Sequence, residues 1–357
     1  MTKIKTLSFE GETIYCGVDI HKKNWKVNIR NSHMELEHFS QNADPDCLAS
    51  HVQKRYPGAN IKVAYEAGFS GFWPCRKLQA AGIDCIVINA ADVPTSDKQK
   101  KQKNDTVDAR KIAKQLSINN LEAVHVPTLT EQNDRSLVRV REQLVADQTR
   151  CKNRIRHLLH FNGLKVANGI DKEKYWTLAF IKALEELDCS DRSLRITLNL
   201  LLAELKDLRK KVLEATTAVR KLAATDLYKK DIELLRSICG IGPTNAMVIR
   251  TELGNIKRFK CFDHLCSYVG FVPSTDDSGD TKATRGITHR CNNRLRTALI
   301  ESSWMLISKD PAMLMKYSAY CKRMDKNKAI IIRIGKHLLS RIKYVLTKRE
   351  KYEACIV

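Results

Sequence analysis

Four carboxylates follow one another along the first third of the chain at a spacing that could hold metal ions. Asp19 lies near the end of the apolar run TIYCGVDI, Glu66 ends the run NIKVAYE, and Asp105 and Asp108 lie one helical turn apart in KNDTVDARK. Hard divalent cations prefer oxygen ligands, and two Mg²⁺ ions about 4 Å apart are what phosphodiester chemistry requires. The pattern therefore predicts such a two-ion site, provided that the fold brings the four side chains together.

The same residues have simpler interpretations when each is taken alone. Asp105 could cap the N-terminus of a helix, as aspartate often does, and Asp108 could form surface ion pairs with the lysines and arginines around it. Asp19 and Glu66 are harder to explain in this way, because a carboxylate at the end of an apolar strand needs partners. As an ordered set, the four residues favour metal binding over charge balance.

Hydrophobic periodicity predicts a βββαβαβα order for the segment that must position these carboxylates. The expected strands and helices are 13–21, 24–31, 34–42, helix 44–56, 60–67, helix 70–82, 83–90 and helix 105–117. In such a sheet the first strand lies beside the fourth, so Asp19 and Glu66 can converge. A helix packed on the sheet can then add Asp105 and Asp108 from one face.

Residues 131–228 have the pattern of long basic helices. Leucines recur at helical spacing between charged residues, and glycine and proline are almost absent from 169 to 225, which is typical of a coiled coil. Arg150 and Arg154 lie in the basic stretch RVREQLVADQTRCKNRIRHLLH. They could follow a nucleic-acid backbone or form a solvated helix face, and the sequence does not choose between these.

Two further motifs follow in the C-terminal part. Gly240 and Gly242 form a Gly-Ile-Gly turn between helical patterns, and such a turn lets backbone N–H groups approach a phosphate because no Cβ intrudes. The next stretch, FVPSTDDSGDTKATRGITHR, is rich in turn formers and lacks periodicity, so we expect a loop. Helical patterns return at 292–307 and in the basic tail from residue 316.

Net charge is the strongest compositional feature. Lys and Arg number 62 against 40 Asp and Glu, which gives a formal charge of +22 and indicates a polyanionic partner. The basic residues are spread over several segments, which favours nucleic acid over a membrane surface. No apolar run approaches the roughly 20 residues that span a bilayer, and the start has no signal-peptide pattern, so we expect a cytoplasmic protein without a membrane partner.

Several motifs together resemble one protein family. GVDIHKKNWKV, AYEAGFSG and KNDTVDARKIAKQL resemble the three acidic motifs of the DEDD transposases, insertion-sequence recombinases related to the Piv DNA invertases. LLRSICGIGPTNA and LCSYVGFVPSTDDSGDTKATRGITHRCNNRLRTALIESS resemble the C-terminal transposase domain of that family. The resemblance is ordered and covers residues 13–307. It implies a RuvC/RNase H-like α/β domain at 1–130 and a helical coiled-coil segment at 131–228. A mostly helical transposase domain with a helix-hairpin-helix-like turn would follow at 229–320, and a basic helical tail at 321–357.

The resemblance also implies a function that residue types alone do not. Asp19, Glu66, Asp105 and Asp108 match the DEDD positions, and Ser278 matches a serine that attacks DNA and forms a phosphoserine intermediate. Members of the family use a structured non-coding "bridge" RNA whose loops pair with target and donor DNA, and they work as tetramers. We therefore expect an RNA-guided, Mg²⁺-dependent DNA recombinase, nucleoid-associated in a bacterial cytoplasm, that acts as a tetramer or dimer of dimers.

The serine assignment depends on the resemblance. Ser274 and Thr275 are nearby hydroxyls that spacing does not exclude, and a serine nucleophile needs activation. Metal and basic side chains near the phosphate could stabilise the alkoxide; the candidates are Lys282, Arg285 and Arg290. Relatives often have proline where this chain has Cys239, and glycine where it has Cys291 in THRCNN.

Two other functions remain open. A RuvC-like nuclease that resolves branched DNA by hydrolysis would need the four carboxylates and the basic surfaces but not Ser278. A helix-hairpin-helix DNA-binding protein with a degenerate nuclease fold would need none of the carboxylates, and their intact order argues against it.

Overall fold

The structure of this chain, a computed structural model, divides into two units, Met1–Pro127 and Thr128–Val357, each of which is described by itself. The residues described are 8–94, 105–164, 176–189, 191–278, 281–288 and 290–353. For residues 105, 106, 273–278 and 281–286 the description concerns the backbone alone.

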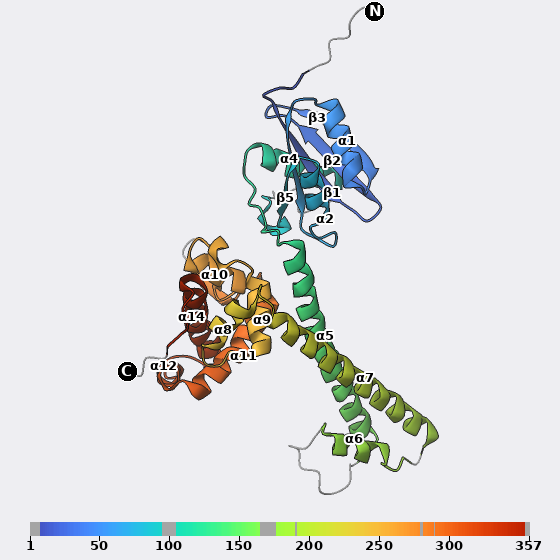
Figure 1. Cartoon of the computed structure of the whole chain (residues 1–357), viewed down its shortest axis with the longest axis vertical. Coiled ribbons are helices and arrows are strands. Elements are labelled where there is room, and N and C mark those ends of the chain that lie inside the picture. The colour runs from blue at the N-terminus through green and yellow to red at the C-terminus, as the bar shows by residue number, and fades with distance from the viewer. Residues whose placement is uncertain are drawn as a thin grey trace, which may run out of the picture. The chain divides into compact units, whose positions relative to one another are not determined.

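The N-terminal unit is built on one mixed five-stranded sheet in the order β3-β2-β1-β4-β5 (Figure 1). The strands are β1 (Thr13–Ile20), β2 (Asn24–Arg30), β3 (Glu35–Asn42), β4 (Asn60–Glu66) and β5 (Asp84–Ile88). β1 to β3 form an antiparallel meander, whereas β4 runs parallel to β1 and β5 parallel to β4. The predicted mixed α/β class, the βββαβαβα order and the pairing of the first strand with the fourth are confirmed.

Helices cover both faces of this sheet. α1 (Pro45–Arg55) and α2 (Trp73–Ala80) share a core with Ile14, Cys16 and Val18 of β1, all buried. Because side chains alternate along a strand, the residues between these point to the other face. That face carries α4 (Asp105–Ser117), whose Ile112 and Leu116 pack with Ala64 of β4; a short 3₁₀ helix, η1 (Ala90–Asp92), follows β5.

The C-terminal unit begins with two long helices, as predicted. α5 (Leu129–Phe161) and α7 (Arg192–Ala223) lie alongside each other with opposite directions, and α6 (Leu178–Glu185) joins the same core (Figure 1). Thr128 begins α5 with a capping box, in which its hydroxyl accepts from the Glu131 N–H at 3.2 Å and the Glu131 carboxylate accepts from the Thr128 N–H at 3.3 Å. The leucine pattern therefore pairs two helices of one chain.

The rest of this unit is mostly helical, as expected for the C-terminal part. One large core joins its helices, from Tyr228 to Leu346. Its elements are α8 (Lys229–Arg236), α9 (Pro243–Leu253), η3 (Ile256–Arg258), α10 (Phe262–Val269), β6 (Pro273–Ser278), β7 (Thr281–Ile287), α11 (Asn293–Lys309), α12 (Pro311–Cys321), α13 (Lys326–Lys328), the π-helix η4 (Ala329–Ile334) and α14 (Gly335–Lys348). Across the described ranges, no helix combines the length and apolarity that crossing a membrane requires.

The expectation of an irregular loop between Phe271 and Arg290 is wrong. β6 and β7 pair there as an antiparallel hairpin, with Ser274 opposite Arg285 and Ser278 opposite Thr281. Turn formers dominate the composition of this segment and hide its strand signals, which are the β-branched residues of TKATRGI.

Candidate active site

The parallel pair β1–β4 brings the first two predicted carboxylates to the same end of the sheet. Val18 lies opposite Tyr65 in this pair, and Asp19 and Glu66 are the next residue on each strand. Neighbouring strands lie about 4.8 Å apart, and residues in register on them project to the same face. Asp19 and Glu66 are therefore positioned as close neighbours at the carboxyl ends of β1 and β4.

Helix α4 packs directly against the strand that carries Asp19. A Cβ built on Gly17 would lie 2.2 Å from the carbonyl oxygen of Ala109 and 2.3 Å from the amide nitrogen of Ala113, so no side chain fits there. Ala109 and Ala113 are themselves fully buried. Small residues on both elements thus let the helix backbone approach the sheet closely, on the face to which Asp19 also points.

The direction of α4 places its first turn near the strand ends. Ala113 lies over Gly17, whereas Leu116, near the end of the helix, lines a cavity of about 390 Å³ with Tyr15 and Lys62, which lie near the starts of β1 and β4. The helix therefore runs opposite to β1. Its first turn lies toward the carboxyl ends of β1 and β4.

The fold thus gathers the predicted acidic set at one end of one sheet face. Asp19, Glu66 and Asp108 all belong to elements that meet there, and Asp105 is the first residue of α4, although its side chain lies outside the description. Carboxylate oxygens are the donors that a hard divalent cation such as Mg²⁺ prefers, so the chemistry of the set fits such an ion. Among the side chains that are described, no three His, Cys, Asp or Glu form a metal-binding group by themselves.

His21 joins this site although the sequence did not single it out. Its Nε2 lies 3.1 Å from Oδ2 of Asp19, and the Asp19 side chain is 22% exposed. At that distance a protonated imidazole forms an ion pair with the carboxylate, so His21 is a second ionisable side chain beside the predicted metal ligand. The residue was missed because it follows the strand in a turn-like HKK stretch, where a histidine has no distinctive spacing.

An ion pair also ties α4 to β3, the strand at one edge of the sheet. Arg110 donates from Nε to Oε2 of Glu35 in β3 at 2.7 Å and from Nη2 to Oε1 at 3.0 Å. These hydrogen bonds lower the pKa of the Glu35 carboxyl. Because Arg110 follows Asp108 by two residues, this clamp also restrains the first half of α4.

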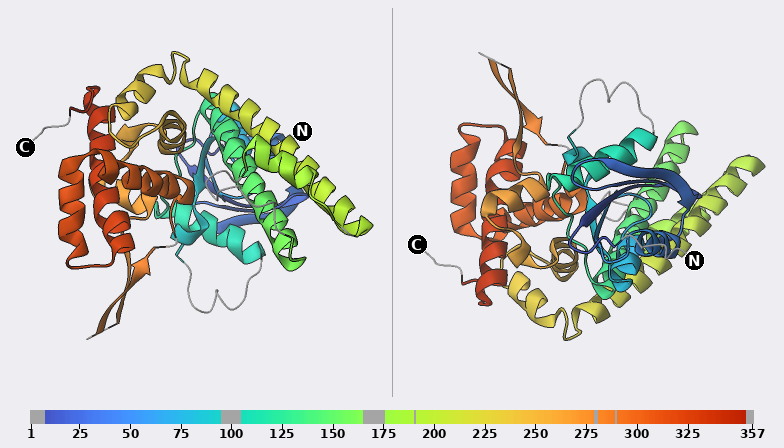
Figure 2. Two further views of the ribbon diagram at one scale, coloured as in Figure 1. Left: turned by 90° about the horizontal axis from the view of Figure 1, so that it is seen from below. Right: turned by 90° about the horizontal axis from the view of Figure 1, so that it is seen from above.

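Ser278 is the last residue of β6, at the tip of the hairpin. In Figure 2 the hairpin (orange) projects from the helical part of its own unit. The Thr288 N–H donates to the Val272 carbonyl at 3.2 Å and closes the base of the hairpin.

The basic residues predicted near Ser278 lie on the return strand and after it. In the backbone register of the hairpin, Lys282 lies opposite Asp277 and Arg285 lies opposite Ser274. Arg290 is exposed, and its N–H donates to the hydroxyl of Thr288 at 3.1 Å.

The two predicted turn glycines have different structural reasons. Gly240 has φ +90°, and a Cβ there would lie 2.6 Å from the Ser302 carbonyl oxygen and 2.7 Å from the Leu306 nitrogen of α11. Gly242 begins α9 with φ −81° and has open space around its Cβ position. Glycine at 240 is therefore required by helix packing, whereas Gly242 is the position that is open to a phosphate.

Arg150 and Arg154 already have carboxylate partners. Arg150 pairs with Asp147 one turn earlier on α5, and Arg154 Nη2 donates to Oε1 of Glu204 on α7 at 2.5 Å. Both arginine side chains are more than half exposed. These pairs are what the solvated-face interpretation expects, and a nucleic-acid phosphate would have to compete with them.

The two departures from the family pattern are accommodated differently. Gly270 ends α10 with φ +84°, and a Cβ there would lie 2.5 Å from the Cβ of Cys291. Cys291 thus packs against a backbone that only glycine leaves room for. Cys239 packs, half-buried, against the large C-terminal core.

The chain matches two family models of transposases. Residues 16–162 match the family model of DEDD transposases of IS110 elements, described as Transposase, and residues 232–318 match the model described as Transposase IS116/IS110/IS902 family. The chain is 30% identical over 257 residues to the transposase for insertion sequence element IS1111A of Coxiella burnetii, covering 71% of this chain and 69% of that protein.

Two further relatives extend over more of the chain. The chain is 28% identical over 309 residues to y4rJ of Sinorhizobium fredii, covering 79% of this chain and 76% of that protein. It is 22% identical over 302 residues to the transposase for insertion sequence element IS1533 of Leptospira borgpetersenii, covering 82% of this chain and 84% of that protein.

A mixed α/β domain that matches the DEDD model, followed by a mostly helical C-terminal part, defines this chain as a transposase of the DEDD class, a DNA-processing enzyme whose DEDD domain indicates dependence on a divalent metal. The chain belongs to the IS116/IS110/IS902 family of insertion-sequence transposases. The family resemblance inferred from the motifs is confirmed.

Proposed function

We propose that this transposase is an RNA-guided recombinase that cuts and rejoins donor and target DNA through Mg²⁺-binding carboxylates and a serine nucleophile. The observation that carries the proposal is the packing of α4 on Gly17, which sets its first turn at the carboxyl ends of β1 and β4. In this proposal the N-terminal domain, residues 1–130, is RuvC-like. A coiled-coil segment (131–228), a transposase domain (229–320) and a basic tail (321–357) follow.

The carboxylates of Asp19, Glu66, Asp105 and Asp108 would hold two Mg²⁺ ions. Bound metal would supply charge stabilisation at the attacking and leaving oxygens of the scissile phosphate. The chain's own contribution is to fix these ligands by the β1–β4 register and by the contact of α4 with β1. His21, whose Nε2 lies 3.1 Å from Oδ2 of Asp19, would restrain that ligand as an ion-pair partner.

Ser278 would act as the nucleophile. Its hydroxyl oxygen forms a bond to phosphorus while one phosphorus–deoxyribose oxygen bond breaks, so the sugar leaves with a hydroxyl and the serine loses its proton. The bond energy stays in the phosphoserine link, and attack by a second DNA hydroxyl rejoins the strand and restores the serine. Lys282, Arg285 and Arg290 are the cations proposed to stabilise the charge that develops at the phosphate.

Nucleic-acid choice would follow a guide. The chain has a large excess of Lys and Arg, which favours recognition of a backbone, and a structured non-coding RNA would read donor and target sequence by base pairing. Gly242, Arg150 and Arg154 are proposed contacts to either nucleic acid. The working form is proposed to be a tetramer or a dimer of dimers.

The deciding experiment measures covalent protein–DNA adducts. Wild-type protein is incubated with the nucleic acid that copurifies with it, Mg²⁺ and DNA carrying the element's ends, and adducts are resolved under denaturing conditions. We expect adducts that disappear in Ser278→Ala but persist in Ser274→Ala and Thr275→Ala. Adducts that survive in Ser278→Ala would refute the assignment of the nucleophile, and recombination of the native sites after RNase treatment would refute guidance by RNA.

Hydrolysis is the competing function. A RuvC-like nuclease that resolves branched DNA would use the same carboxylates with water as nucleophile. It would leave free DNA ends and form no covalent adduct, and its cleavage rate would not change in Ser278→Ala. Complete hydrolysis of branched DNA without an adduct in the wild type would therefore favour it.

A further inference from the structure

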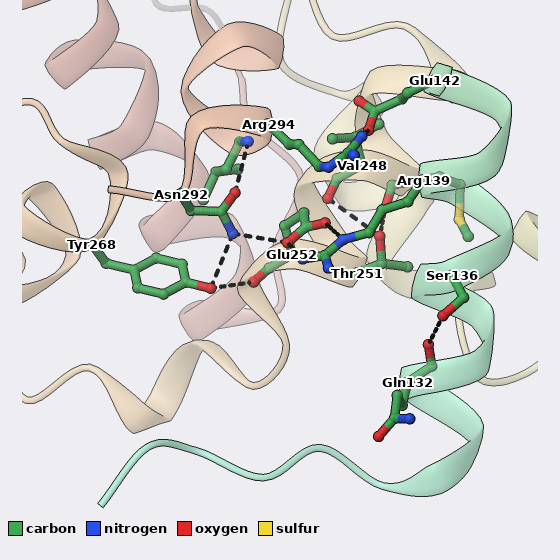
Figure 3. A network of polar contacts seen from close by, with 12 residues as sticks. Gln132, Ser136, Arg139, Glu142, Val248, Thr251, Glu252, Tyr268, Asn292 and Arg294 are labelled. Atoms are coloured by element: carbon green, nitrogen blue, oxygen red, sulfur yellow. Dashed lines mark hydrogen bonds and ion pairs between the residues drawn. The ribbon is translucent and has the colours of Figure 1, made fainter. Parts of the chain in front are cut away.

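A buried carboxylate lies beneath the hairpin that carries Ser278. Glu252, near the end of α9, is 2% exposed, and its two oxygens accept from Nε and Nη2 of Arg139 in α5 at 2.6 and 2.8 Å (Figure 3). Asn292 donates to the same carboxylate from Nδ2 at 2.8 Å. Burial alone would raise the pKa of Glu252, but the hydrogen bonds from Arg139 and Asn292 outweigh it and hold the pKa below its ordinary value.

The partners of Glu252 lie on both sides of the hairpin in sequence. Tyr268, at the end of α10, precedes the hairpin; its hydroxyl donates to the Glu252 carbonyl at 3.0 Å and lies 3.1 Å from Asn292 Nδ2. Asn292 follows the hairpin and caps α11 by accepting from the Leu295 N–H at 3.2 Å. The Asn292 N–H also donates to the Tyr268 carbonyl at 2.8 Å. The two chain segments that enter and leave the hairpin are therefore tied to each other and to one carboxylate.

A further contact holds the return segment. Arg296 Nη1 donates to the Thr288 carbonyl at 2.9 Å, and Thr288 itself closes the base of the hairpin. Arg139 belongs to the long helix α5, so the same carboxylate also couples the hairpin base to α5. A buried carboxylate with three directed hydrogen bonds has few alternative positions, because any shift leaves charge unpaired.

From this geometry we propose that Glu252 is a positioning residue for the serine hairpin, acting through Asn292 and Tyr268. This inference rests on the proposed role of Ser278. Glu252 touches no reacting atom; it fixes the direction in which the hairpin leaves the helical core. Since a nucleophile displaced by about 1 Å can lose on the order of 100-fold in rate, such an anchor bears directly on strand attack.

The test compares three variants of the full-length protein. Glu252→Gln removes the charge of the carboxylate but keeps its size. Tyr268→Phe removes only the hydroxyl and keeps the ring, whose centroid lies 4.6 Å from Cζ of Arg258. We expect this variant to fold, so it tests the proposal even if Glu252→Gln does not fold. Glu142→Gln is the control, because Glu142 also pairs α5 with α11, through Arg294 at 2.8 Å, but accepts no hydrogen bond from Arg139, Tyr268 or Asn292.

Two readouts separate anchoring from general stability. In the free protein, Glu252→Gln should speed hydrogen exchange of the amides of 281–288 about tenfold, and Tyr268→Phe by a smaller factor, while amides within α9 and α11 change less. With DNA, the rate of adduct formation at saturation should fall by about 10- to 100-fold while the half-saturating DNA concentration stays within about twofold. Glu142→Gln should change neither.

The outcomes are distinct. Equal acceleration of exchange throughout α9, α11 and the hairpin, or unchanged exchange at 281–288 in Glu252→Gln and Tyr268→Phe, would overturn the positioning role. If the wild type forms no adduct, the serine chemistry fails, while the exchange measurement still decides whether Glu252 anchors the hairpin.

Discussion

Gly17 of β1 lies directly beneath Ala109 of α4, so close that a single added methyl group would lie 2.2 Å from the Ala109 carbonyl oxygen. Asp19 follows Gly17 by two residues on the same face of the strand, and Asp108 precedes Ala109. The contact between two small residues therefore sets the spacing between two predicted metal ligands.

This contact predicts the effect of one methyl group. Gly17→Ala should push α4 away from the sheet, cost about 1–3 kcal/mol of stability or more, and lower DNA cleavage more than stability alone explains. Gly68→Ala is the control, since the nearest atom to a Cβ at Gly68 would be the Glu66 carbonyl oxygen at 4.0 Å, an ordinary van der Waals contact. Thermal unfolding and cleavage in Mg²⁺ are measured side by side; a Gly17→Ala protein with normal cleavage would contradict the close-packing argument.

Removal of single carboxylates should separate cleavage from binding. Asp19→Ala, Glu66→Ala, Asp105→Ala and Asp108→Ala should each abolish strand cleavage, as chelation of the divalent metal should in the wild type. Binding of nucleic acid should be unchanged or tighter, because each change removes negative charge from a basic protein. Near-normal cleavage by two or more of the variants would return these residues to a charge-balancing role.

The two glycines of the Gly-Ile-Gly turn should behave differently. Gly240→Ala places a methyl group against the backbone of α11 at a positive φ, so it should destabilise the C-terminal unit by about 2 kcal/mol or more. Gly242→Ala should fold normally and reduce affinity for nucleic acid if this turn contacts a phosphate. Unfolding curves and salt-dependent binding distinguish the two effects, and equal binding by Gly242→Ala and wild type would remove the turn from the interface.

Acid should weaken the hairpin anchor in a definite pH range. The pKa of Glu252 is depressed in the folded protein, so its stabilisation is complete above the unfolded value of about 4.3 and is lost as pH falls through the lower folded value. At pH 7, Glu252→Gln should be less stable than the wild type by about 2 kcal/mol. Below about pH 4.5, its free energy of unfolding should fall less steeply with pH than that of the wild type. Parallel acid-unfolding curves for the two proteins would contradict this assignment.

Mixing experiments test whether one active site uses two subunits. The carboxylates and Ser278 lie on separate units of the chain, so a Ser278→Ala subunit and an Asp19→Ala subunit each keep what the other lacks. If sites form between subunits, the mixture should recover partial recombination although neither variant is active alone. Each variant should still assemble like the wild type by size-exclusion chromatography, and a mixture as inactive as its parts would place both groups in one subunit.

Much of the N-terminal unit could be predicted because its signals are local. Alternation in TIYCGVDI and NIKVAYE indicates strands, and the order of the elements then requires the first strand to pair with the fourth. Asp19 and Glu66 could be placed together on that basis. The hairpin at 273–287 could not, because its strands are short and the turn-forming residues outweigh their β-branched residues in composition.

The sequence by itself determined the acidic motifs, the α/β order, the two long helices and the family. These features depend on residue type and on spacings of a few positions, which backbone geometry converts directly into strands and helices. Only the tertiary structure decided why residues 17 and 240 must be glycine, that His21 lies beside Asp19, and that Glu252 joins Arg139, Tyr268 and Asn292. Such contacts join residues up to 113 positions apart, and no local periodicity specifies which distant backbone will lie against a given Cβ or carboxylate.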